Sequence, residues 1–345
     1  MGILKRRAIL IMRRFVRFLL LGMLSFVLAT ACASNSAPPK NSLSSPSSTD
    51  CKTFQHEFGE TQICGQPERI IAFDPPALDM LLSLEVQPVG IAGSQPTGYT
   101  GDPTITGSLK PGDAVDGVRY LGDRLTIRPT YIGTSSMPSL ETVLKLKPDL
   151  ILSRYINNES YATLSKIAPV LPLKTDLIDW QQDFLILAQV LNRESQAQQV
   201  IEQYQQTLAN TKIKLQPVNQ NTKLLILDMT SMDNVSIITS KNYMGFLLQN
   251  LGFQIVITQS SSDLGIIPVS LEYLPQLEPD LVVVLERGQL AAQVKNQWRQ
   301  NPILQSVASQ ADHLLFADFY LWATLEGPIG AKYMIEDIQA QLNKD

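Results

Sequence analysis

The sequence predicts an α/β protein of two pseudo-symmetric lobes, each a three-layer α/β unit, joined by one long α-helix. Three features predict this fold: a segment that occurs twice, a strand–helix–strand pattern, and a long helical stretch between the halves. With 345 residues, the chain is long enough for two lobes that each have a core.

The duplicated segment recurs at a constant offset of 131 positions. Residues 139–150 read SLETVLKLKPDL, and residues 270–281 read SLEYLPQLEPDL. A serine suited to an N-cap opens each copy, which places Glu141 and Glu272 in the first turn of a short helix. A Pro-Asp turn and an apolar run close each copy, as expected for entry into a buried strand. The repeat therefore predicts one helix–turn–strand unit in each lobe.

The first lobe is predicted over residues 51–178. Its elements are expected to be, in order, a strand over 69–73, a helix over 77–84 with proline near its first turn, a strand over 86–92 and an irregular stretch over 94–132. The strand–helix–strand order argues for parallel pairing with a right-handed crossover.

The linking helix is predicted over residues 179–214, because apolar residues there follow a 3.6-residue period and neither proline nor glycine interrupts them. Asn192 marks the place where this helix would break, if it breaks. The second lobe follows over residues 215–345, with a strand over 224–227 ending in Asp228, a helix over 246–251 capped by Gly252, a strand over 281–285, an amphipathic stretch over 289–300, a strand over 314–317 and a last helix from Pro328.

The N-terminus reads as a secretory signal over residues 1–31, with basic residues followed by an apolar run. It ends in Leu-Ala-Thr-Ala-Cys32, which resembles a bacterial lipobox and predicts lipidation of Cys32. The Ser/Pro-rich residues 32–50 would then be a flexible tether. A signal anchor or plain secretion signal with an incidental Cys32 is the alternative, and either Met1 or Met12 can start the chain.

Lipidation of Cys32 leaves Cys51 and Cys64, an even pair in an oxidising compartment. The residues between them predict a hairpin that turns at Gly59-Glu60. In a strict two-residue turn Gln55 would face Cys64, so the disulfide stays an open question at this point.

Composition and motifs argue against nucleic-acid-binding proteins, cluster-type metal-binding proteins and enzymes. A net charge of −4 gives no basic field for nucleic acid. The only two histidines, His56 and His313, fall in different lobes, so no cluster-type metal site is expected. No glycine-rich phosphate loop follows a strand and no catalytic triad is recognisable, so we expect neither an enzyme nor a cofactor.

Several motifs together resemble one family. They are Cys51…His56…Gly59 with Pro67-Glu68-Arg69-Ile70, Tyr120-Leu121-Gly122-Asp123, Gly133-Thr134…Pro138-Ser139-Leu140-Glu141 and Trp322…Gly327-Pro328. With the lipobox, the two lobes and the doubled S-L-E…P-D-L, they resemble the helix-linked (class III) substrate-binding lipoproteins of bacterial ABC importers for ferric siderophores, haem and cobalamin. The similarity covers residues 51–345 and is nearest the ferric-siderophore and ferric-citrate branch. Leu84-Glu85-Val86 departs from the family's usual Leu-Gly-Val.

The resemblance implies that Glu141 and Glu272 pair with arginines of a permease dimer, which works with its ATPase. A two-fold symmetric permease suits a partner that presents two like groups. The alternative is structural, because a helix dipole favours glutamate in a first turn regardless of function. The resemblance also implies a ligand cleft between the two lobes, and a monomer that is lipid-anchored on the periplasmic or cell-surface side of the membrane.

In open α/β lobes, ligands meet the loops beyond the carboxyl ends of the strands. Arginine and aromatic side chains in these loops suit an anionic ferric chelate, and the candidates are Arg154, Trp322, Tyr155, Arg287, Tyr131, Tyr320 and Tyr99. Each has a structural alternative, since aromatic residues near strand ends are often packing and Arg154 could pair with Glu159.

The expected function is to capture a ferric siderophore or ferric citrate and deliver it to an importer, with iron present only inside its chelator. Haem or cobalamin as the ligand, and a sensor lipoprotein without a transport role, are the alternatives.

Overall fold

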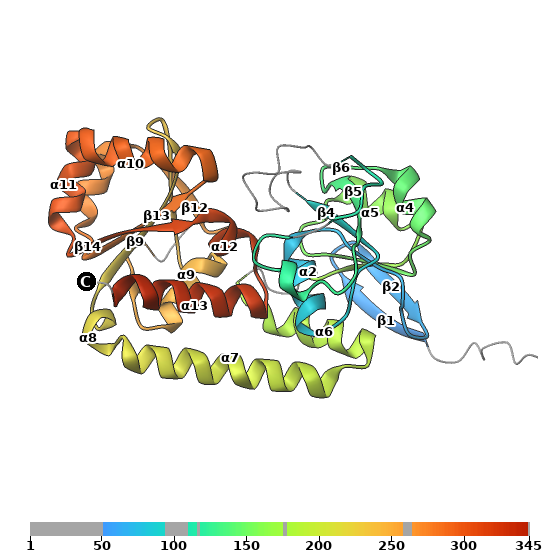
Figure 1. Cartoon of the computed structure of the whole chain (residues 1–345). Coiled ribbons are helices and arrows are strands. Elements are labelled where there is room, and N and C mark those ends of the chain that lie inside the picture. Colours follow the sequence, from blue (N-terminus) through green and yellow to red (C-terminus); the bar gives the residue numbers. More distant parts are fainter. Residues whose placement is uncertain (1–50, 94–109, 116–117, 175–177, 258–263, 344–345) are drawn as a thin grey trace, which may run out of the picture. The chain divides into compact units, whose positions relative to one another are not determined.

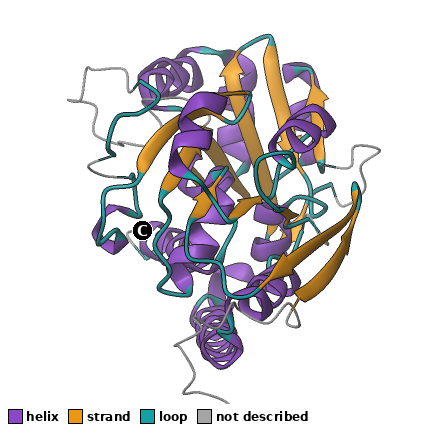
Figure 2. Cartoon of the chain, turned by 90° about the vertical axis from the view of Figure 1, so that its right-hand side faces the viewer, coloured by secondary structure: helices purple, strands orange, loops and turns teal. Residues whose placement is uncertain are grey.

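The computed structural model describes residues 51–93, 110–115, 118–174, 178–257 and 264–343. The predicted signal peptide 1–31, the lipidation site Cys32, the tether 32–50 and the candidate Tyr99 lie outside these residues. Two six-stranded sheets organise the described chain, and helices lie on both sides of the strands (Figures 1 and 2).

The first sheet has the strand order β6-β5-β4-β3-β7-β8. All neighbours are parallel except β5 and β6. Its strands are β3 (Ile70–Ala72), β4 (Gly90–Gly93), β5 (Thr130–Thr134), β6 (Met137–Pro138), β7 (Leu150–Ser153) and β8 (Val170–Pro172), and its helices are α2 (Pro75–Ser83), η1 (Gly122–Arg124), α4 (Leu140–Leu146) and α5 (Asn158–Leu164). The expected strand–helix–strand unit is present as β3-α2-β4. The irregular stretch was predicted to end at residue 132, and this boundary is wrong because β5 already begins at Thr130.

The second sheet has the order β12-β10-β9-β13-β14, and β11 pairs with the start of β9. Its strands are β9 (Lys223–Ser231), β10 (Asn234–Ile238), β11 (Gln254–Ile255), β12 (Ile266–Val269), β13 (Leu281–Glu286) and β14 (His313–Asp318). Its helices are α8 (Gln216–Asn219), α9 (Tyr243–Asn250), η2 (Leu271–Leu277), η3 (Gly288–Leu290), α10 (Ala291–Gln300), α11 (Pro302–Gln310), α12 (Phe319–Thr324) and α13 (Pro328–Leu342). The prediction that the first strand ends at Asp228 is wrong, because β9 continues to Ser231 through antiparallel pairing with β10.

The link between the two sheets consists of α6 (Gln181–Leu191) and α7 (Glu194–Lys214) rather than one uninterrupted helix. The break falls at Asn192, whose φ of 53° is left-handed, a conformation that asparagine tolerates better than most residues. The position expected for a break is therefore confirmed. α7 packs against both α6 and the C-terminal helix α13 (Figure 1).

The sequence repeat is also a repeat of backbone structure. Lys147 and Glu278 end the two short helices, and both have a φ of 46°. The carboxylate of Asp149 accepts hydrogen bonds from the backbone N–H groups of Glu68 and Arg69, and that of Asp280 accepts one from Lys223. Each aspartate thus ties its strand to the start of the neighbouring parallel strand.

The second copy departs from the first in its helix, since η2 is a 3-10 helix and α4 is an α-helix. Pro275 lies inside η2 and has no N–H to donate. Ser139 caps α4 through the N–H of Thr142, whereas Ser270 makes no side-chain cap. The N-cap prediction is therefore confirmed for Ser139 and wrong for Ser270.

The hydrophobic core is continuous across the two lobes. One cluster joins strand residues of both sheets with α2, α6 and α13, and includes the buried side chains of Trp180, Phe184 and Trp322. Two smaller clusters fill the opposite faces of the sheets, one under α10 and α11 and the other beside α5. Each sheet therefore packs on both faces, as a three-layer lobe requires.

The predicted hairpin consists of β1 (Cys51–His56) and β2 (Gly59–Cys64). Its turn is at Glu57-Phe58, so the predicted turn at Gly59-Glu60 is wrong by two residues. The change of register makes Cys51 the partner of Cys64, with 4.0 Å between their Cα atoms, and the two residues form a disulfide.

His56 fastens this hairpin to the first lobe. Its Nδ1 accepts from the N–H of Phe58 at 3.2 Å, so the proton of the neutral ring is on Nε2. Nε2 donates to the hydroxyl of Thr61 at 2.9 Å, and that hydroxyl donates to the carbonyl of Val170 at 2.6 Å. The ring also meets Tyr161 edge-on, with 5.3 Å between centroids.

Acid is expected to loosen this attachment. Burial lowers the pKa of His56 below its ordinary value of 6.5, because the charged ring is poorly solvated there. The unfolded chain therefore binds the proton first, and the stability that His56 contributes is lost as the pH falls below 6.5. We expect urea midpoints at pH 7.5 and pH 5.5 to differ less in His56→Gln than in the wild type. His313→Gln is the control, and an equal pH dependence in wild type and His56→Gln would contradict the assignment.

Candidate functional site

The carboxyl ends of β13 and β14 lie side by side and next to Asp228 of β9, at an edge where an open parallel sheet presents its loops. The register pairs Leu285 with Asp228 and Glu286 with Asp318. Polar and aromatic residues therefore gather at this edge of the second sheet.

Arg287 follows β13 and is held by two neighbours. Its Nε and Nη2 donate to the two carboxylate oxygens of Asp228, at 3.1 and 2.7 Å. The guanidinium carbon is 3.4 Å from the ring centroid of Phe319. One third of the side chain is exposed (33%), so the group is fixed in place and still reachable from solvent.

Arg119 reaches the same edge from the first lobe. It forms an ion pair with Asp318 at the end of β14. Its guanidinium carbon is 5.1 Å from the ring centroid of Tyr120 and 5.4 Å from that of Tyr320. Tyr120 has a φ of 64°, a left-handed backbone conformation that is uncommon for an aromatic residue and is often found at functional sites.

We call these seven residues the arginine cluster: Arg119, Tyr120, Asp228, Arg287, Asp318, Phe319 and Tyr320. Next to it is a hollow of about 470 Å³, lined by Val118, Tyr120, Gly122, Asp123, Leu321 and Tyr333. Both lobes contribute to the hollow and to the cluster, which fits a ligand held between them.

The structure places Arg154 differently from the expectation. Its side chain is fully buried, and Nη1 donates to Asp183 at 2.6 Å while Nε donates to Glu326 at 3.2 Å. Burial raises the pKa of Glu326, and the guanidinium of Arg154 opposes that rise. Arg154 therefore has no surface for a ligand in this structure. Its guanidinium instead ties the end of β7 to α6 and to the segment before α13.

Asp74 fixes the backbone of the loop that carries Arg154. One carboxylate oxygen accepts from the Ser153 hydroxyl and from the backbone N–H groups of Arg154 and Tyr155, at 2.6, 2.7 and 3.0 Å. The other caps α2 through the N–H of Ala77 at 3.0 Å. The loop that carries Arg154 is thus fixed in the first lobe before it meets Glu326.

The other candidate ligand-binding residues differ in how far their side chains are buried. Trp322 is fully buried and donates its indole N–H to Asp337 at 2.8 Å, and Tyr131 is buried with a hydroxyl that has no hydrogen-bond partner among the described residues. Tyr155 is 45% exposed, although its hydroxyl donates to Glu326. Tyr320 is half-buried within the arginine cluster. Packing removes Trp322 and Tyr131 from the accessible surface, so the expectation that they line a cleft does not match their positions.

Sequence reasoning missed Arg119 as a site residue. It immediately precedes the Tyr120-Leu121-Gly122-Asp123 motif, which was the available signal. Its partner Asp318 is 199 residues away in the sequence, a distance over which no local pattern reports contact.

Asp79 joins α2 to the beginning of α13. Its carboxylate is fully buried and accepts from the backbone N–H groups of Ile329 and Gly330, at 2.9 and 2.7 Å. A Cβ on Gly327 would lie 2.5 Å from the Asp79 carboxyl carbon, so only glycine permits this approach. Burial raises the pKa of Asp79 to about 6.

Replacing Asp79 with alanine is expected to lower the free energy of unfolding by about 2–4 kcal/mol, because two buried N–H groups lose their acceptor. The folded-state pKa of about 6 lies above the ordinary value of 3.8, so the stability from this carboxyl declines as the pH rises through that interval. The loss caused by Asp79→Ala should therefore be larger at pH 5 than at pH 7.5 in urea unfolding. A larger loss at pH 7.5 would contradict the buried, proton-binding carboxyl.

Glu141 and Glu272 are both exposed and both in the first turn of their helices. The Glu141 side chain is 78% exposed and pairs with Lys145 at 2.7 Å, which lowers the pKa of its carboxyl. Nothing in their packing requires a carboxylate at either position.

Two six-stranded α/β lobes linked through α6 and α7 define the helix-linked class of substrate-binding proteins. The profile of the family described as "Periplasmic binding protein" matches residues 95–319. The chain belongs to this family, and the expectation of a binding protein rather than an enzyme is confirmed by that membership.

Relatives extend the similarity over nearly the whole chain. The Fe(3+)-citrate-binding protein YfmC of Bacillus subtilis is 25% identical, over 92% of this chain and 93% of that protein. The probable siderophore-binding lipoprotein YfiY of the same organism is 24% identical, over 96% and 99%. The crystal structure of Staphylococcus aureus SirA complexed with staphyloferrin B has a TM-score of 0.65 at 23% identity, covering 85% of this chain and 98% of that one.

None of the helices in the described ranges is both long and apolar enough to cross a membrane. Over the same part of the chain, no three His, Cys, Asp or Glu side chains come together in a way that could hold a metal ion.

Proposed function

We propose that this protein binds a ferric siderophore or ferric citrate between its lobes and delivers it to the permease of an ABC importer. Membership of the periplasmic binding protein family supports a binding role, and the names of the relatives support a ferric chelate. The observation that carries the proposal is the arginine cluster, in which two arginines stacked on aromatic rings come from different lobes.

The cluster suits the chemistry of such a ligand. Ferric chelates present carboxylate, hydroxamate or catecholate oxygens around the metal, and a guanidinium fork donates to such oxygens in pairs. Asp228 pairs with Arg287, and Asp318 pairs with Arg119. Ligand oxygens would share or take over these donors, while Tyr120, Tyr320 and Phe319 supply apolar walls. An arginine that can exchange its aspartate for a ligand oxygen suits a chelate with anionic oxygens around the metal.

Arg287→Ala is expected to weaken binding of ferric citrate or of a ferric siderophore by roughly 10–100-fold, since charge-assisted hydrogen bonds of this kind contribute about 1.5–3 kcal/mol. Calorimetric titration of the wild type and the variant with the ferric chelate measures the change in affinity. Arg299→Ala is the matched control, because Arg299 is an exposed arginine on α10 away from the cluster. Affinity within twofold of the wild type in Arg287→Ala would show that the ligand does not use the cluster.

We further propose that Glu141 and Glu272 are the docking groups for the permease. Their exposure, their equivalent positions in the repeat and the two-fold symmetry expected of a permease dimer support this role. Exposed ion pairs of this kind contribute more to orientation and encounter rate than to affinity.

The family supports a periplasmic location, and the lipobox supports attachment to the membrane through a lipid. The family is one of periplasmic binding proteins. We propose that Cys32 is lipidated after removal of residues 1–31 and that residues 32–50 tether a monomeric body to the membrane. In that body, 51–178 and 215–345 would be the lobes and 179–214 the link.

A further inference from the structure

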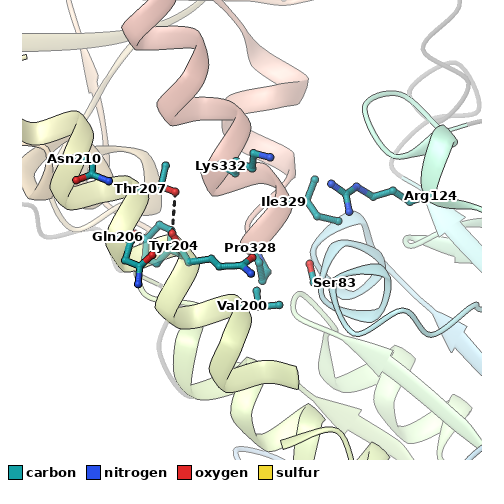
Figure 3. A pocket seen from close by; sticks show the side chains of 11 residues that line it. Ser83, Arg124, Val200, Tyr204, Gln206, Thr207, Asn210, Pro328, Ile329 and Lys332 are labelled. Atoms are coloured by element: carbon teal, nitrogen blue, oxygen red, sulfur yellow. Dashed lines mark hydrogen bonds between the residues drawn. The ribbon is translucent and has the colours of Figure 1, made fainter. Parts of the chain in front are cut away.

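A second hollow, of about 400 Å³, lies where the first lobe meets α7 and α13 (Figure 3). Four elements line it: Ser83 from the end of α2, Arg124 from η1, Gln203, Thr207 and Asn210 from α7, and Lys332 from α13. None of its lining residues belongs to the arginine cluster. We call it the rear pocket.

The charged side chains that line the rear pocket are both cations, and they come from different lobes. Arg124 belongs to the first lobe, and within the described ranges its guanidinium has neither an ion pair nor a hydrogen bond. Lys332 belongs to α13, and its Nζ is 3.8 Å from Glu336 in a pair that is about half exposed (54%). Among the described residues no carboxylate lines the hollow, so the positive charge of Arg124 and Lys332 is only weakly balanced.

Asp79 is close enough to Arg124 for their charges to interact, but its carboxylate is already occupied. Both of its carboxylate oxygens already accept from the first turn of α13, and Ser83 also donates to it. Asp79 is fully buried, whereas Arg124 is exposed. Asp79 is not among the described residues that line the hollow.

The face contributed by α7 adds uncharged polar groups. Thr207 donates its hydroxyl to the carbonyl of Gln203 at 2.8 Å, one turn earlier in the helix (Figure 3). Gln203 and Asn210, which carry side-chain amides, line the same hollow as Arg124 and Lys332. A volume of this size is in the range of small-molecule sites.

From this arrangement we propose that the rear pocket binds a small, multiply charged anion of the carboxylate or phosphate class, bridged by Arg124 and Lys332. Such an anion would satisfy two cations that the protein itself leaves without a buried partner. Because the cations belong to different lobes, occupancy would hold η1 against α13 and would stabilise the folded protein as any ligand specific to that state does. The site is independent of the ferric chelate proposed for the arginine cluster.

The test is thermal unfolding of the full chain with tricarballylate and with inorganic phosphate, each at constant ionic strength. A saturable rise in Tm with either anion is expected, and Arg124→Gln and Lys332→Gln should each weaken the response at least tenfold. The comparison of the two anions distinguishes a carboxylate source from a phosphate source.

Lys212→Gln is the control, because Lys212 is an exposed cation on the same helix α7 outside the pocket. It should keep the wild-type response. An equal response in Arg124→Gln and wild type, or no saturable response to either anion, would overturn the proposal. A response lost in Arg287→Ala but kept in Arg124→Gln would place the anion in the arginine cluster instead and would also overturn it.

Discussion

Replacing Asp183 with alanine is expected to lower the free energy of unfolding by about 3–5 kcal/mol, which is the usual cost of leaving one member of a buried ion pair without its partner. Asp183 and Arg154 are both fully buried, and 2.6 Å separates the carboxylate oxygen from Nη1. Without Asp183, the guanidinium keeps Glu326 at 3.2 Å but loses its nearest carboxylate.

The matched control is an ion pair of similar length at the surface. Lys145 and Glu141 are 2.7 Å apart, and their side chains are 73% and 78% exposed. Lys145→Ala should lower the free energy of unfolding far less than Asp183→Ala does, because water and salt screen exposed pairs. Urea unfolding of both variants, with the m-value compared to confirm two-state behaviour, measures the difference. If the two variants lost similar stability, the buried ion network would not hold the lobes together as the geometry indicates.

A second large effect, on uptake of the ferric chelate into cells, is expected from changes to the two repeat glutamates. Replacing both Glu141 and Glu272 with alanine should abolish or severely reduce uptake of the ferric chelate in cells, while the affinity of the purified protein for that chelate stays unchanged. Both side chains project from exposed helical turns and are not part of the arginine cluster, so apart from the exposed Glu141–Lys145 pair the change removes only proposed permease contacts.

Single replacements separate docking from a purely structural role. Glu141→Ala and Glu272→Ala should each reduce uptake less than the double change does, if each lobe contacts its own half of the permease. Glu278→Ala is the control, an exposed glutamate at the end of η2 rather than in its first turn. A double variant that lost chelate affinity would show that the glutamates belong to the cleft, and wild-type uptake would remove them from docking.

The architecture was predictable because the repeat carries it in short-range patterns. The serine and glutamate of the first turn, the Pro-Asp turn and the apolar run each act within a few residues, so SLETVLKLKPDL and its second copy indicated one unit per lobe, although Ser270 does not cap its helix. The break at Asn192 was predictable for the same reason. The hairpin turn was not, because a shift of two residues keeps the same alternation and only the pairing of Cys51 with Cys64 distinguishes the registers.

The site was predictable as a set of loops and not as a set of side chains. Arg154 and Arg287 each follow a strand of the repeat, so their patterns were indistinguishable. Their partners differ: Arg154 meets Glu326, 172 residues away, inside the protein, whereas Arg287 meets Asp228 at an accessible edge. Contacts over such separations decide which arginine is buried, and no local pattern in one sequence contains them.

The most direct test of chelate capture is a calorimetric titration of the purified protein with ferric citrate and a set of ferric siderophores, beside iron-free citrate, haem and cobalamin. We predict saturable one-to-one binding of at least one ferric chelate, weakened in Arg287→Ala and retained in Glu141→Ala/Glu272→Ala. Binding of haem or cobalamin with no response to any ferric chelate would contradict the proposed ligand class.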